Sequence, residues 1–369
     1  MTNPSGLIRV LVAEDSPTAR ALLVRMLSSA SGLEVIGEAT NGIDAVEMTK
    51  RLKPDVVTMD IQMPGLDGFE ATTRIMTECP TPIVIISSLD VKSVEFSMEA
   101  LRAGALAVLP KPVGPTSADF GQVSRYLAAT VRSMSQVKLV RRWPANAPYK
   151  ASAAALGTAT SSASGTGPGV TPRPAATQPL KVIAIAASTG GPAALHKLFA
   201  ALPADFPVPI LFVQHIALGF ADGFASWLDG SSKLRVKVAR AGEPVRKGTA
   251  YLAPDDHHLG ISERSTVVLS GAPPVGSFRP SGSFLFESVA NVAGAAAIGV
   301  ILTGMGSDGV EGLRALRSAG GLIIAQDEAS CEIFGMPGAA VAAGVTDQVL
   351  PLETIAAQLQ RIAAARGSA

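Results

Sequence analysis

The sequence lacks the features that would place this chain in a membrane or on nucleic acid. Its 31 lysines and arginines are matched by 30 aspartates and glutamates, which leaves a formal net charge of +1. This near-equality of positive and negative charges gives no indication of a nucleic-acid partner or of an anionic membrane surface. No apolar run approaches the roughly 18 residues that a membrane-spanning helix needs. We therefore expect no nucleic-acid binding and no membrane insertion.

Cysteine is nearly absent as well. The only two cysteines, Cys79 and Cys331, lie far apart and fall in what we expect to be different domains. This disfavours a disulfide and favours a reducing compartment. The segment from Met1 to Gly6 is short and polar and carries no apolar signal-peptide core. We therefore expect a cytoplasmic protein.

What the chain does contain is enough apolar sequence for more than one core. Its 369 residues are 47% hydrophobic, which suits two or three domains. From about 145 to 179 the chain is Ala, Ser, Thr, Gly and Pro with almost no large apolar residue, which is typical of a flexible linker. A helical pattern at 120–142 runs into it. We expect a first domain at 7–135, a helix end and linker at 136–179, and a second domain at 180–366.

Both domains alternate short apolar strands with helical segments. Expected strands of the first domain are 8–13, 34–39, 56–59, 83–87 and 105–109. Those of the second are 182–187, 209–213, 250–253, 298–302 and 322–325, with a short antiparallel excursion at 266–270. Such alternation predicts an α/β protein made of two doubly wound, mostly parallel sheets. Chemistry in these sheets collects at the carboxyl ends of the strands.

Acidic and polar residues follow the strand ends of the first domain. Glu14 and Asp15 come after the first strand, Asp60 after the third, and Ser87 and Lys111 after the fourth and fifth. Clustered carboxylates suit Mg²⁺, which takes a few protein ligands and keeps waters. Each acid alone could be a helix cap or a loop residue, but the set at these positions favours a phosphoryl site. Ser87 could bond a phosphoryl oxygen, and Lys111 would supply a cation.

This domain resembles a response-regulator receiver (flavodoxin-like fold). The resemblance is carried by the Glu14 to Ser16 run, MDIQMPGLDG at 59–68, the Ser87–Ser88 pair and PKP at 110–112. It implies that Asp60 is phosphorylated from a histidine kinase, with Mg²⁺ held by Glu14, Asp15 and Asp60. Many receivers carry a Tyr or Phe three residues before the lysine, where this chain has Val108. The signal would then pass by another movement, for example of a surface packed on the second domain.

A serine, a histidine and an aspartate follow three strands of the second domain. Ser188 ends the apolar run 181–187 on a sharp strand-to-helix turn, His215 follows the strand at 209–213, and Asp308 follows the strand at 298–302. A serine hydroxyl is a weak nucleophile unless a histidine takes its proton and an aspartate orients the imidazole. The order Ser, His, Asp and the lack of G-x-S-x-G differ from α/β-hydrolases.

Other interpretations of these residues stay open at this point. Ser188 could cap the helix that begins near Pro192, and the following Gly-Gly pair could bind a phosphate, although no Walker lysine is present. His215 could be an ordinary loop residue, and Asp308 a turn or cap residue. The His257–His258 pair is expected in a solvated turn rather than a zinc site, and Cys331 as a buried thiol.

The second domain resembles the catalytic domain of the chemotaxis protein-glutamate methylesterases (a Rossmann-like fold). Matching runs are ASTGG at 187–191, QH at 214–215, YLAP at 251–254, LTGMGSDG at 302–309 and AQDEASCEIFGMP at 325–337. The resemblance implies Ser188 as the nucleophile, His215 as its base and Asp308 as the orienting partner. It also implies an oxyanion role for the backbone amide near Met305, with Thr189 beside the nucleophile.

The family implies the reaction and its partners. The substrates would be glutamate γ-methyl esters, and glutamines to be deamidated, on the cytoplasmic helices of chemoreceptors, with a chemotaxis histidine kinase as phosphodonor and no metal in the second domain. Two departures, Ile216 after the histidine and Ser283 where an aspartate is usual, are expected near the substrate cleft. The rival hypothesis is a phosphorylation-dependent adaptor in which Ser188 is only a helix cap.

Overall fold

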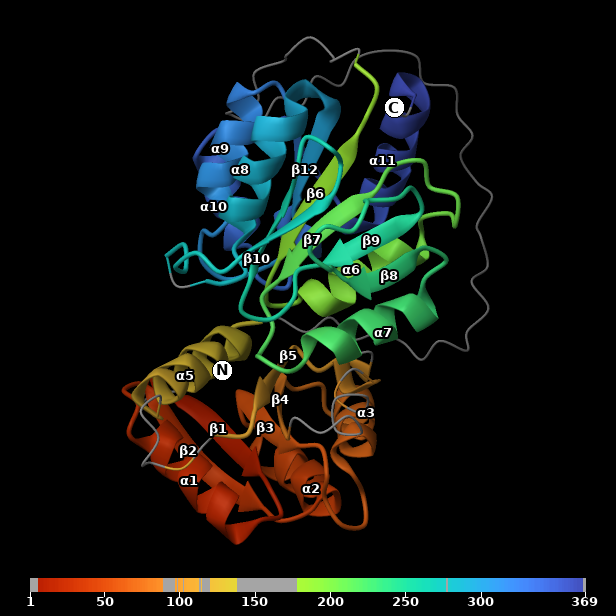
Figure 1. Ribbon diagram of the computed structural model, residues 1–369. Coiled ribbons are helices and arrows are strands. Elements are labelled where there is room, and N and C mark those ends of the chain that lie inside the picture. The colour runs from red at the N-terminus through yellow and green to blue at the C-terminus, as the bar shows by residue number, and fades with distance from the viewer. Residues whose placement is uncertain are drawn as a thin grey trace, which may run out of the picture.

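The computed structural model describes two α/β domains, one below the other in Figure 1. The described residues are 6–88, 97, 99–101, 103–112, 114, 120–137, 178–276 and 278–367. Most of the predicted linker, 138–177, and the end of the helical pattern at 120–142 lie outside them. Among the described residues, no helix is both long and apolar enough to cross a bilayer.

A parallel sheet of five strands forms the first domain, in the order β2-β1-β3-β4-β5. The strands are β1 (Ile8–Ala13), β2 (Leu33–Ala39), β3 (Val56–Asp60), β4 (Ile83–Ser87) and β5 (Ala107–Pro110). Every pairing is parallel, and this order is that of flavodoxin-like folds. The predicted strands are confirmed, although β5 begins at Ala107 rather than at 105.

Helices cover both faces of this sheet. They are α1 (Pro17–Ser28), α2 (Gly42–Leu52), α3 (Gly68–Glu78) and α5 (Phe120–Ser135). Alternate residues of a strand point to opposite faces, so Val10 and Val12 of β1 pack in the core beneath α1 and α5. Leu11 packs with the residues of α2 and α3 on the other face. This doubly wound arrangement leaves the carboxyl ends of the strands free for a site.

The second domain is built on seven parallel strands in the order β14-β13-β12-β6-β7-β9-β8. The strands are β6 (Val182–Ala187), β7 (Ile210–Gln214), β8 (Arg235–Val238), β9 (Thr249–Leu252), β12 (Ala297–Ile301), β13 (Leu322–Gln326) and β14 (Gln348–Leu350). The predicted antiparallel excursion is confirmed as β11 (Val267–Ser270), which pairs with β10 (His258–Ile261). The sequence did not predict β8, β10 and β14, which are only three or four residues long.

Two helical layers enclose this larger sheet (Figure 1). One layer holds α6 (Gly191–Ala200), α7 (Ala221–Ser231) and α11 (Leu352–Arg366), and the other holds α8 (Gly282–Ala293), α9 (Val310–Ser318) and α10 (Met336–Ala342). The central strand β6 serves both layers. Ile183 and Ile185 pack towards α6, α7 and α11, while Val182 and Ala184 pack towards α8, α9 and α10.

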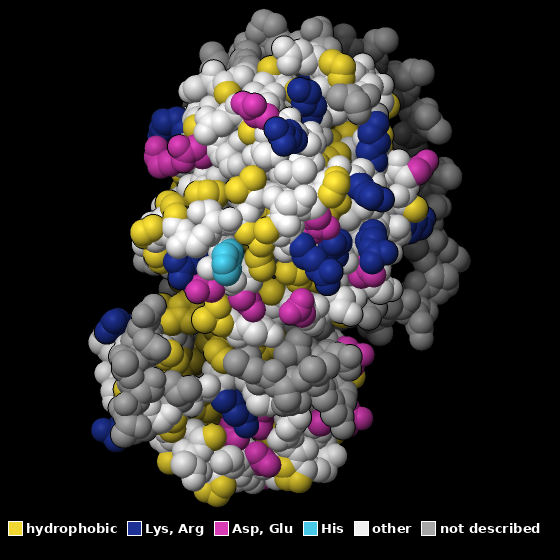
Figure 2. Space-filling view, in the orientation of Figure 1, with side chains coloured by type: hydrophobic (Ala, Val, Ile, Leu, Met, Phe, Trp, Pro, Cys, Tyr) yellow, Lys and Arg dark blue, Asp and Glu magenta, His cyan; other side chains and the backbone are white. Residues whose placement is uncertain are grey.

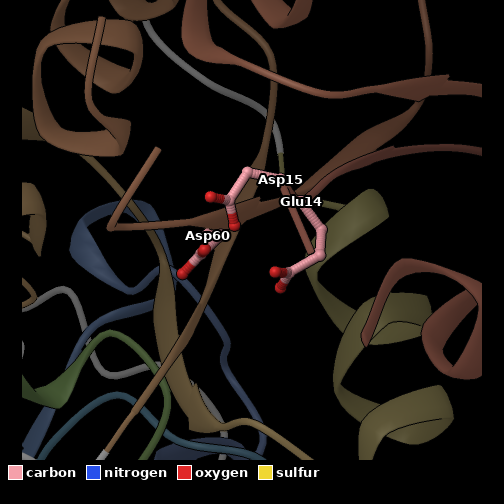
Figure 3. Close-up of side chains that lie close together, drawn as sticks. All are labelled: Glu14, Asp15 and Asp60. Atoms are coloured by element: carbon pink, nitrogen blue, oxygen red, sulfur yellow. The ribbon is translucent and has the colours of Figure 1, made fainter. Parts of the chain in front are cut away.

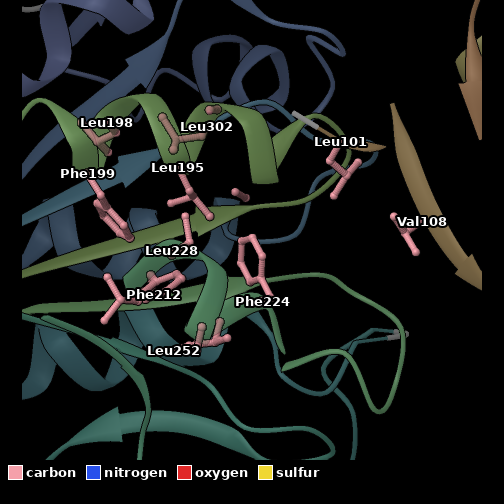
Figure 4. Packing of buried hydrophobic residues seen from close by; sticks show 14 of the residues in the cluster. Leu101, Val108, Leu195, Leu198, Phe199, Phe212, Phe224, Leu228, Leu252 and Leu302 are labelled. Atoms are coloured by element: carbon pink, nitrogen blue, oxygen red, sulfur yellow. The ribbon is translucent and has the colours of Figure 1, made fainter. Parts of the chain in front are cut away.

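The first domain meets the second through β5 and α5. Val108 on β5 is buried in the same hydrophobic cluster as the first core layer of the second domain, with Ile216 packed against that cluster. Figure 4 shows Val108 and Leu101 beside that core. Ile333 of the second domain packs against the cluster that contains Leu127 and Val131 of α5, and hydrophobic side chains gather where the domains meet (Figure 2). Because β5 is an edge strand, this contact also covers its exposed edge.

Candidate active site

Ser188, His215 and Asp308 follow three neighbouring strands of the larger sheet. Ser188 comes directly after β6, His215 after β7, and Asp308 a short turn after β12. In the sheet, β6 lies between β12 and β7. The chain passes from β6 to β7 on one side and later returns to β12 on the other, so the strand order reverses here. Ligands of open α/β sheets bind at the carboxyl ends of the strands at such a point.

Backbone bonds on both sides fix the turn that carries Ser188. Its N–H donates to the carbonyl of Thr303 at 3.0 Å, and its carbonyl accepts from Gln214 Nε2 at 2.7 Å. The cap of α6 is Gly190, at φ 77°, and no side chain caps the helix. A Cβ at Gly190 would lie 2.8 Å from the Cβ of Glu332, so a glycine is required there. Ser188 is therefore not a helix cap, and its hydroxyl stays available for chemistry.

His215 is held by its ring and by its backbone. Its N–H donates to the carbonyl of Ala187 at 3.0 Å, which ties it to the strand before Ser188. Its Nε2 lies 2.9 Å from Oδ2 of Asp308, while Nδ1 is buried without a hydrogen-bond partner among the described residues. The ring of Phe278 stacks on the imidazole, with 4.0 Å between ring centroids and 5° between planes. Nδ1 is thus the nitrogen left to accept a proton in the pocket shared with Ser188.

Asp308 is surrounded by donors at the start of α8. Oδ1 accepts from the hydroxyl of Ser281 at 2.7 Å and from the N–H of Ser283 at 3.1 Å, and Oδ2 accepts from the N–H of Gly282 at 2.6 Å and from His215. Burial acts to raise the pKa of Asp308, but the bonds from His215, Ser281 and Gly282 outweigh it and hold the pKa below its usual range. A helix N-terminus also favours a negative charge. Asp308 is therefore a fixed carboxylate, and the cap of its own following helix, α9, is Gly309.

The turn at 303–309 passes close to Ser188. A Cβ at Gly304 would lie 2.8 Å from the Cβ of Ser188. Thr303 Oγ1 donates to the carbonyl of Thr189 at 2.9 Å, so the residue after the serine is tied to this turn. Met305 is the next residue along, and its sulfur accepts a bond of 2.8 Å from Ser133 on α5 of the first domain. The predicted oxyanion loop is thus in contact with the first domain.

The strand ends of the smaller sheet bring together the predicted phosphoryl site. Ligand atoms of Glu14, Asp15 and Asp60 all lie within 4.8 Å of one another, and Figure 3 shows their carboxylates turned towards a common space. Lys111 Nζ donates to Asp60 at 2.8 Å and to Glu14 at 2.9 Å. Ser87 is buried at the end of β4, and its carbonyl accepts from the N–H of Lys111.

These carboxylates have fewer donors than Asp308 has. Burial raises the pKa of Glu14 and of Asp60, and the bonds from Lys111 only partly offset it. For Lys111, burial acts to lower the pKa, but its bonds to Asp60 and Glu14 raise it overall. Oε2 of Glu14 is buried without a partner among the described residues. A cluster of three carboxylates that is offset by one lysine, and that leaves a carboxylate oxygen unbonded, fits a hard cation such as Mg²⁺.

Comparison with known proteins identifies the relatives of this chain. The model of the CheB methylesterase family matches residues 183–359, and that of the response regulator receiver domain matches residues 10–118. A protein-glutamate methylesterase/protein-glutamine glutaminase of Myxococcus xanthus is 52% identical over 98% of both chains. The chain belongs to the CheB methylesterase family. A second relative of the same name, from Anaeromyxobacter dehalogenans, is 52% identical over 96% of this chain and 98% of its own.

Of the two departures from the methylesterase pattern, only Ile216 borders the pocket. Ile216 lines the same space as Ser188 and His215. Ser283 is 9% exposed, and its hydroxyl accepts from the N–H of Gly309 at 2.8 Å while its own N–H bonds to Asp308. Ser283 therefore contacts Asp308 rather than the space beside Ser188, and its place near the substrate cleft stays a prediction. Its N–H stabilises the carboxylate of Asp308.

The pair His257–His258 is split by the fold of this methylesterase domain. His257 is exposed in a turn, as expected, whereas His258 begins β10 and is completely buried. The interpretation of both as turn residues is thus wrong for His258. The available signal was its position at the start of the His-Leu-Gly-Ile run. Cys331 is half-buried, and burial, followed by the charges of Asp327 and its neighbours, raises the pKa of its thiol to about 12, so it stays protonated.

The receiver covers the pocket beside Ser188. The pocket has a volume of about 30 Å³, and roughly 10–15 Å³ is needed to hold one water. From the catalytic side it is bounded by Ser188, His215 and Ile216, and from the receiver side by Val108 of β5 and Tyr126 of α5. In this arrangement the space directly beside Ser188 has room for water only, while a larger cavity of about 710 Å³ between the domains borders Gly190 and Thr303.

Proposed function

We propose that this chain hydrolyses glutamate γ-methyl esters on chemoreceptors, and deamidates glutamines there, through Ser188. His215 takes the proton of the serine hydroxyl at Nδ1, and Asp308 at Nε2 orients the ring and stabilises the imidazolium that forms. The serine oxygen then attacks the carbonyl carbon, and His215 returns the proton to the departing methanol, or to ammonia in the case of an amide. Water hydrolyses the acyl-enzyme by the same exchange of a proton.

The observation that carries this proposal is the pairing of His215 with Asp308. One imidazole nitrogen is occupied by a carboxylate that four donors keep ionised. The other is buried without a hydrogen-bond partner among the described residues, and the residue that carries it lines one pocket with Ser188. An adaptor that used Ser188 only as a helix cap would not need this arrangement, and the cap of α6 is Gly190. The names of the relatives support the same substrates.

The oxyanion of the tetrahedral intermediate needs donors near the serine. We assign this role to the backbone amide of Met305, with Thr189 beside the nucleophile, because the turn at 303–309 lies against Ser188 and Thr303 ties that turn to Thr189. Preorganised donors of this kind contribute about 10²–10³-fold to turnover.

In the receiver we propose that Asp60 accepts a phosphoryl group from a histidine kinase in the cytoplasm. Glu14, Asp15 and Asp60 would hold Mg²⁺, which supplies positive charge for the phosphoryl oxygens. Lys111 supplies a further cation, and Ser87 a hydroxyl for a phosphoryl oxygen. Lys111 bonds to Asp60 directly, so a phosphoryl group on Asp60 changes the partners of this lysine.

Strand β5 links the receiver site to the serine pocket. It carries Val108 over the pocket and leads, three positions later, to Lys111 at the phosphoryl site. A change at Lys111 therefore acts on the strand that closes the pocket, without the aromatic residue that many receivers have at the position of Val108. We propose that the unphosphorylated receiver blocks Ser188 and that phosphorylation loosens it.

The test is methanol release from methylated receptor by the full chain, with and without a small phosphodonor. Ser188→Ala should lose nearly all turnover, by at least about 10³-fold, because the three residues act as a unit. Unchanged turnover in that variant would instead favour the adaptor. In Asp60→Ala, the ratio of turnover with phosphodonor to turnover without it should fall to one, and a full stimulation there would refute the switch.

A further inference from the structure

The loop before α8 holds His215 directly through one residue and, through Asp308, by a second. This loop, 271–281, connects β11 to α8. Near its middle it carries Phe278, whose ring lies flat on the imidazole of His215. At its end it carries Ser281, whose hydroxyl donates to Asp308. The base is thus stacked and oriented by residues of one loop, and the position of that loop decides the geometry of the base.

His258 fastens this loop at two points. Its Nε2 lies 3.1 Å from the carbonyl of Pro273, and its Nδ1 lies 3.2 Å from the N–H of Ser281. An amide can only donate and a carbonyl can only accept. Nδ1 must therefore be the acceptor and Nε2 must carry the proton, so the ring is the neutral Nε2–H tautomer. With these two bonds, one side chain closes the loop from Pro273 to Ser281.

The imidazole of His258 is itself held rigidly. It is completely buried, it begins β10, and the ring of Phe284 on α8 stacks on it at 4.5 Å. The loop has a second fastening at the surface, where Arg279 bonds to Asp256 and to the carbonyls of Gly271 and Ala272. Asp256 is exposed, so that ion pair is screened by solvent. The hydrogen bonds of His258 to the loop, in contrast, are made by a side chain that is buried from solvent.

We propose that His258 is a positioning residue for the base. It closes the loop at 273–281, and the closed loop holds Asp308 and Phe278 against His215. His258 touches neither the substrate nor Ser188, so its effect passes through the loop. The inference rests on the proposed roles of Ser188, His215 and Asp308, and it extends them to a residue outside the three.

Substitutions of His258 can separate its two bonds. Asn places an amide oxygen near the position of Nδ1 and keeps the acceptor for Ser281. Gln places an amide nitrogen near Nε2 and keeps the donor for Pro273. Phe keeps an aromatic ring against Phe284 and keeps neither bond. His257→Gln is the matched control, because His257 is the exposed neighbour whose ring contacts only the carbonyl of Asp255 among the bonds described.

The experiment follows the reaction of Ser188 with a small fluorophosphonate and the hydrolysis of p-nitrophenyl acetate. Full-length protein is used throughout, with Mg²⁺ and a small phosphodonor present. We expect His258→Phe to lower kcat and the inactivation rate by about 30–100-fold, since displacements near 1 Å cost that much, with KM within about twofold. His258→Asn should recover most of the loss because it keeps the bond next to Asp308. His257→Gln should match the wild type.

Several results would overturn the inference. One is a folded His258→Phe variant that reacts within about threefold of the wild type. Another is a His258→Asn variant that reacts as slowly as His258→Gln, since both substitutions would then only disturb packing. If His258→Phe does not fold to a state that melts cooperatively, this comparison of Asn with Gln tests the inference instead. If wild-type Ser188 does not react at all, the proposed function falls together with the inference. Normal wild-type reaction with equal rates in all variants refutes the inference alone.

Discussion

Glu14 and Asp60 in the receiver and Asp308 in the methylesterase domain all lie at or just after the carboxyl ends of parallel strands, and all three side chains are buried. Their surroundings differ in the supply of donors. Asp308 has four, three of them at the N-terminus of α8, and its pKa is lowered. Glu14 and Asp60 share one lysine and accept one backbone N–H each, and burial raises their pKa values.

The number of hydrogen-bond donors separates a carboxylate that orients a neighbouring side chain from one that can bind a cation. A carboxylate whose lone pairs are all used can orient a neighbour but has none left for a metal or a phosphoryl group. A carboxylate that lacks donors is unstable when ionised and gains from any cation that arrives. The same position at the end of a parallel strand can therefore serve either purpose, and the neighbouring helix N-terminus decides which.

The largest expected effect comes from breaking the donor-rich side. Asp308→Asn should lower kcat for ester hydrolysis by about 10³–10⁴-fold, because the amide cannot accept all four donors and no longer fixes the tautomer of His215. Burst and steady-state kinetics on the full chain measure this. Glu311→Gln, on the exposed side of α9, is the control. A loss of kcat below about tenfold would show that the donors at the N-terminus of α8 are not needed for catalysis.

A second change tests the strand that joins the two sites. Val108→Tyr places a larger side chain in a pocket of about 30 Å³, and overpacking of this kind costs about 1–3 kcal/mol. The receiver should therefore undock, and turnover without phosphodonor should rise by about tenfold at low substrate concentration. Val108→Ile is the size control. Unchanged turnover in the tyrosine variant would place the blocking contact elsewhere.

Magnesium should stabilise the receiver domain, whose carboxylates have few donors, and should not stabilise the methylesterase domain. Raised carboxylate pKa values mean that the folded state binds more protons than the unfolded state, so stability falls as pH rises from the unfolded values towards the raised ones. Mg²⁺ at ten times its Kd should restore about 1.4 kcal/mol, more at pH 7 than at pH 5. Calorimetry measures this.

The same titration has a control in each domain. Glu14→Gln should melt higher than the wild type without Mg²⁺ and should lose most of the response to it. The contribution of Asp308 to stability changes with pH in the opposite direction. Because its pKa is lowered on folding, this residue stabilises the fold above pH 4, and that stability is lost as the pH falls further. A Mg²⁺ response that survives in Glu14→Gln would contradict the assignment of the cation site.

The smallest effect concerns the ring on His215. Phe278→Leu removes the stacked aromatic face but keeps an apolar cover, and we expect kcat to fall by about 2–5-fold, the worth of a partly exposed cation–π contact with the imidazolium. The measurement is kcat against KM for a small ester. Val275→Leu, an exposed change in the same loop, is the control. A change in KM alone would mean that Phe278 binds substrate.

The sequence predicted the strands that carry the sites because those signals are local. Runs such as 182–187 and 298–302 are continuous and apolar, and the polar residue that follows each run had to lie at the sheet edge. Some short strands were missed, since β10 has only four residues and β14 only three, too few to form a clear apolar pattern. His258 was misplaced although it begins a short apolar run. Its packing against Phe284 of α8 is a contact between distant residues, which the sequence pattern alone does not show.

The receiver over the small Ser188 pocket has a kinetic consequence. Under the proposed function it occupies the space that an ester must enter, so it would behave as a competitive inhibitor tethered to its own enzyme. Tethering gives it an effective concentration, and a substrate displaces it only by exceeding that value. Phosphorylation would then appear mainly as a lower apparent KM rather than a higher kcat. Receptors packed densely enough would draw turnover from the unphosphorylated enzyme, which sets a basal rate that follows receptor density.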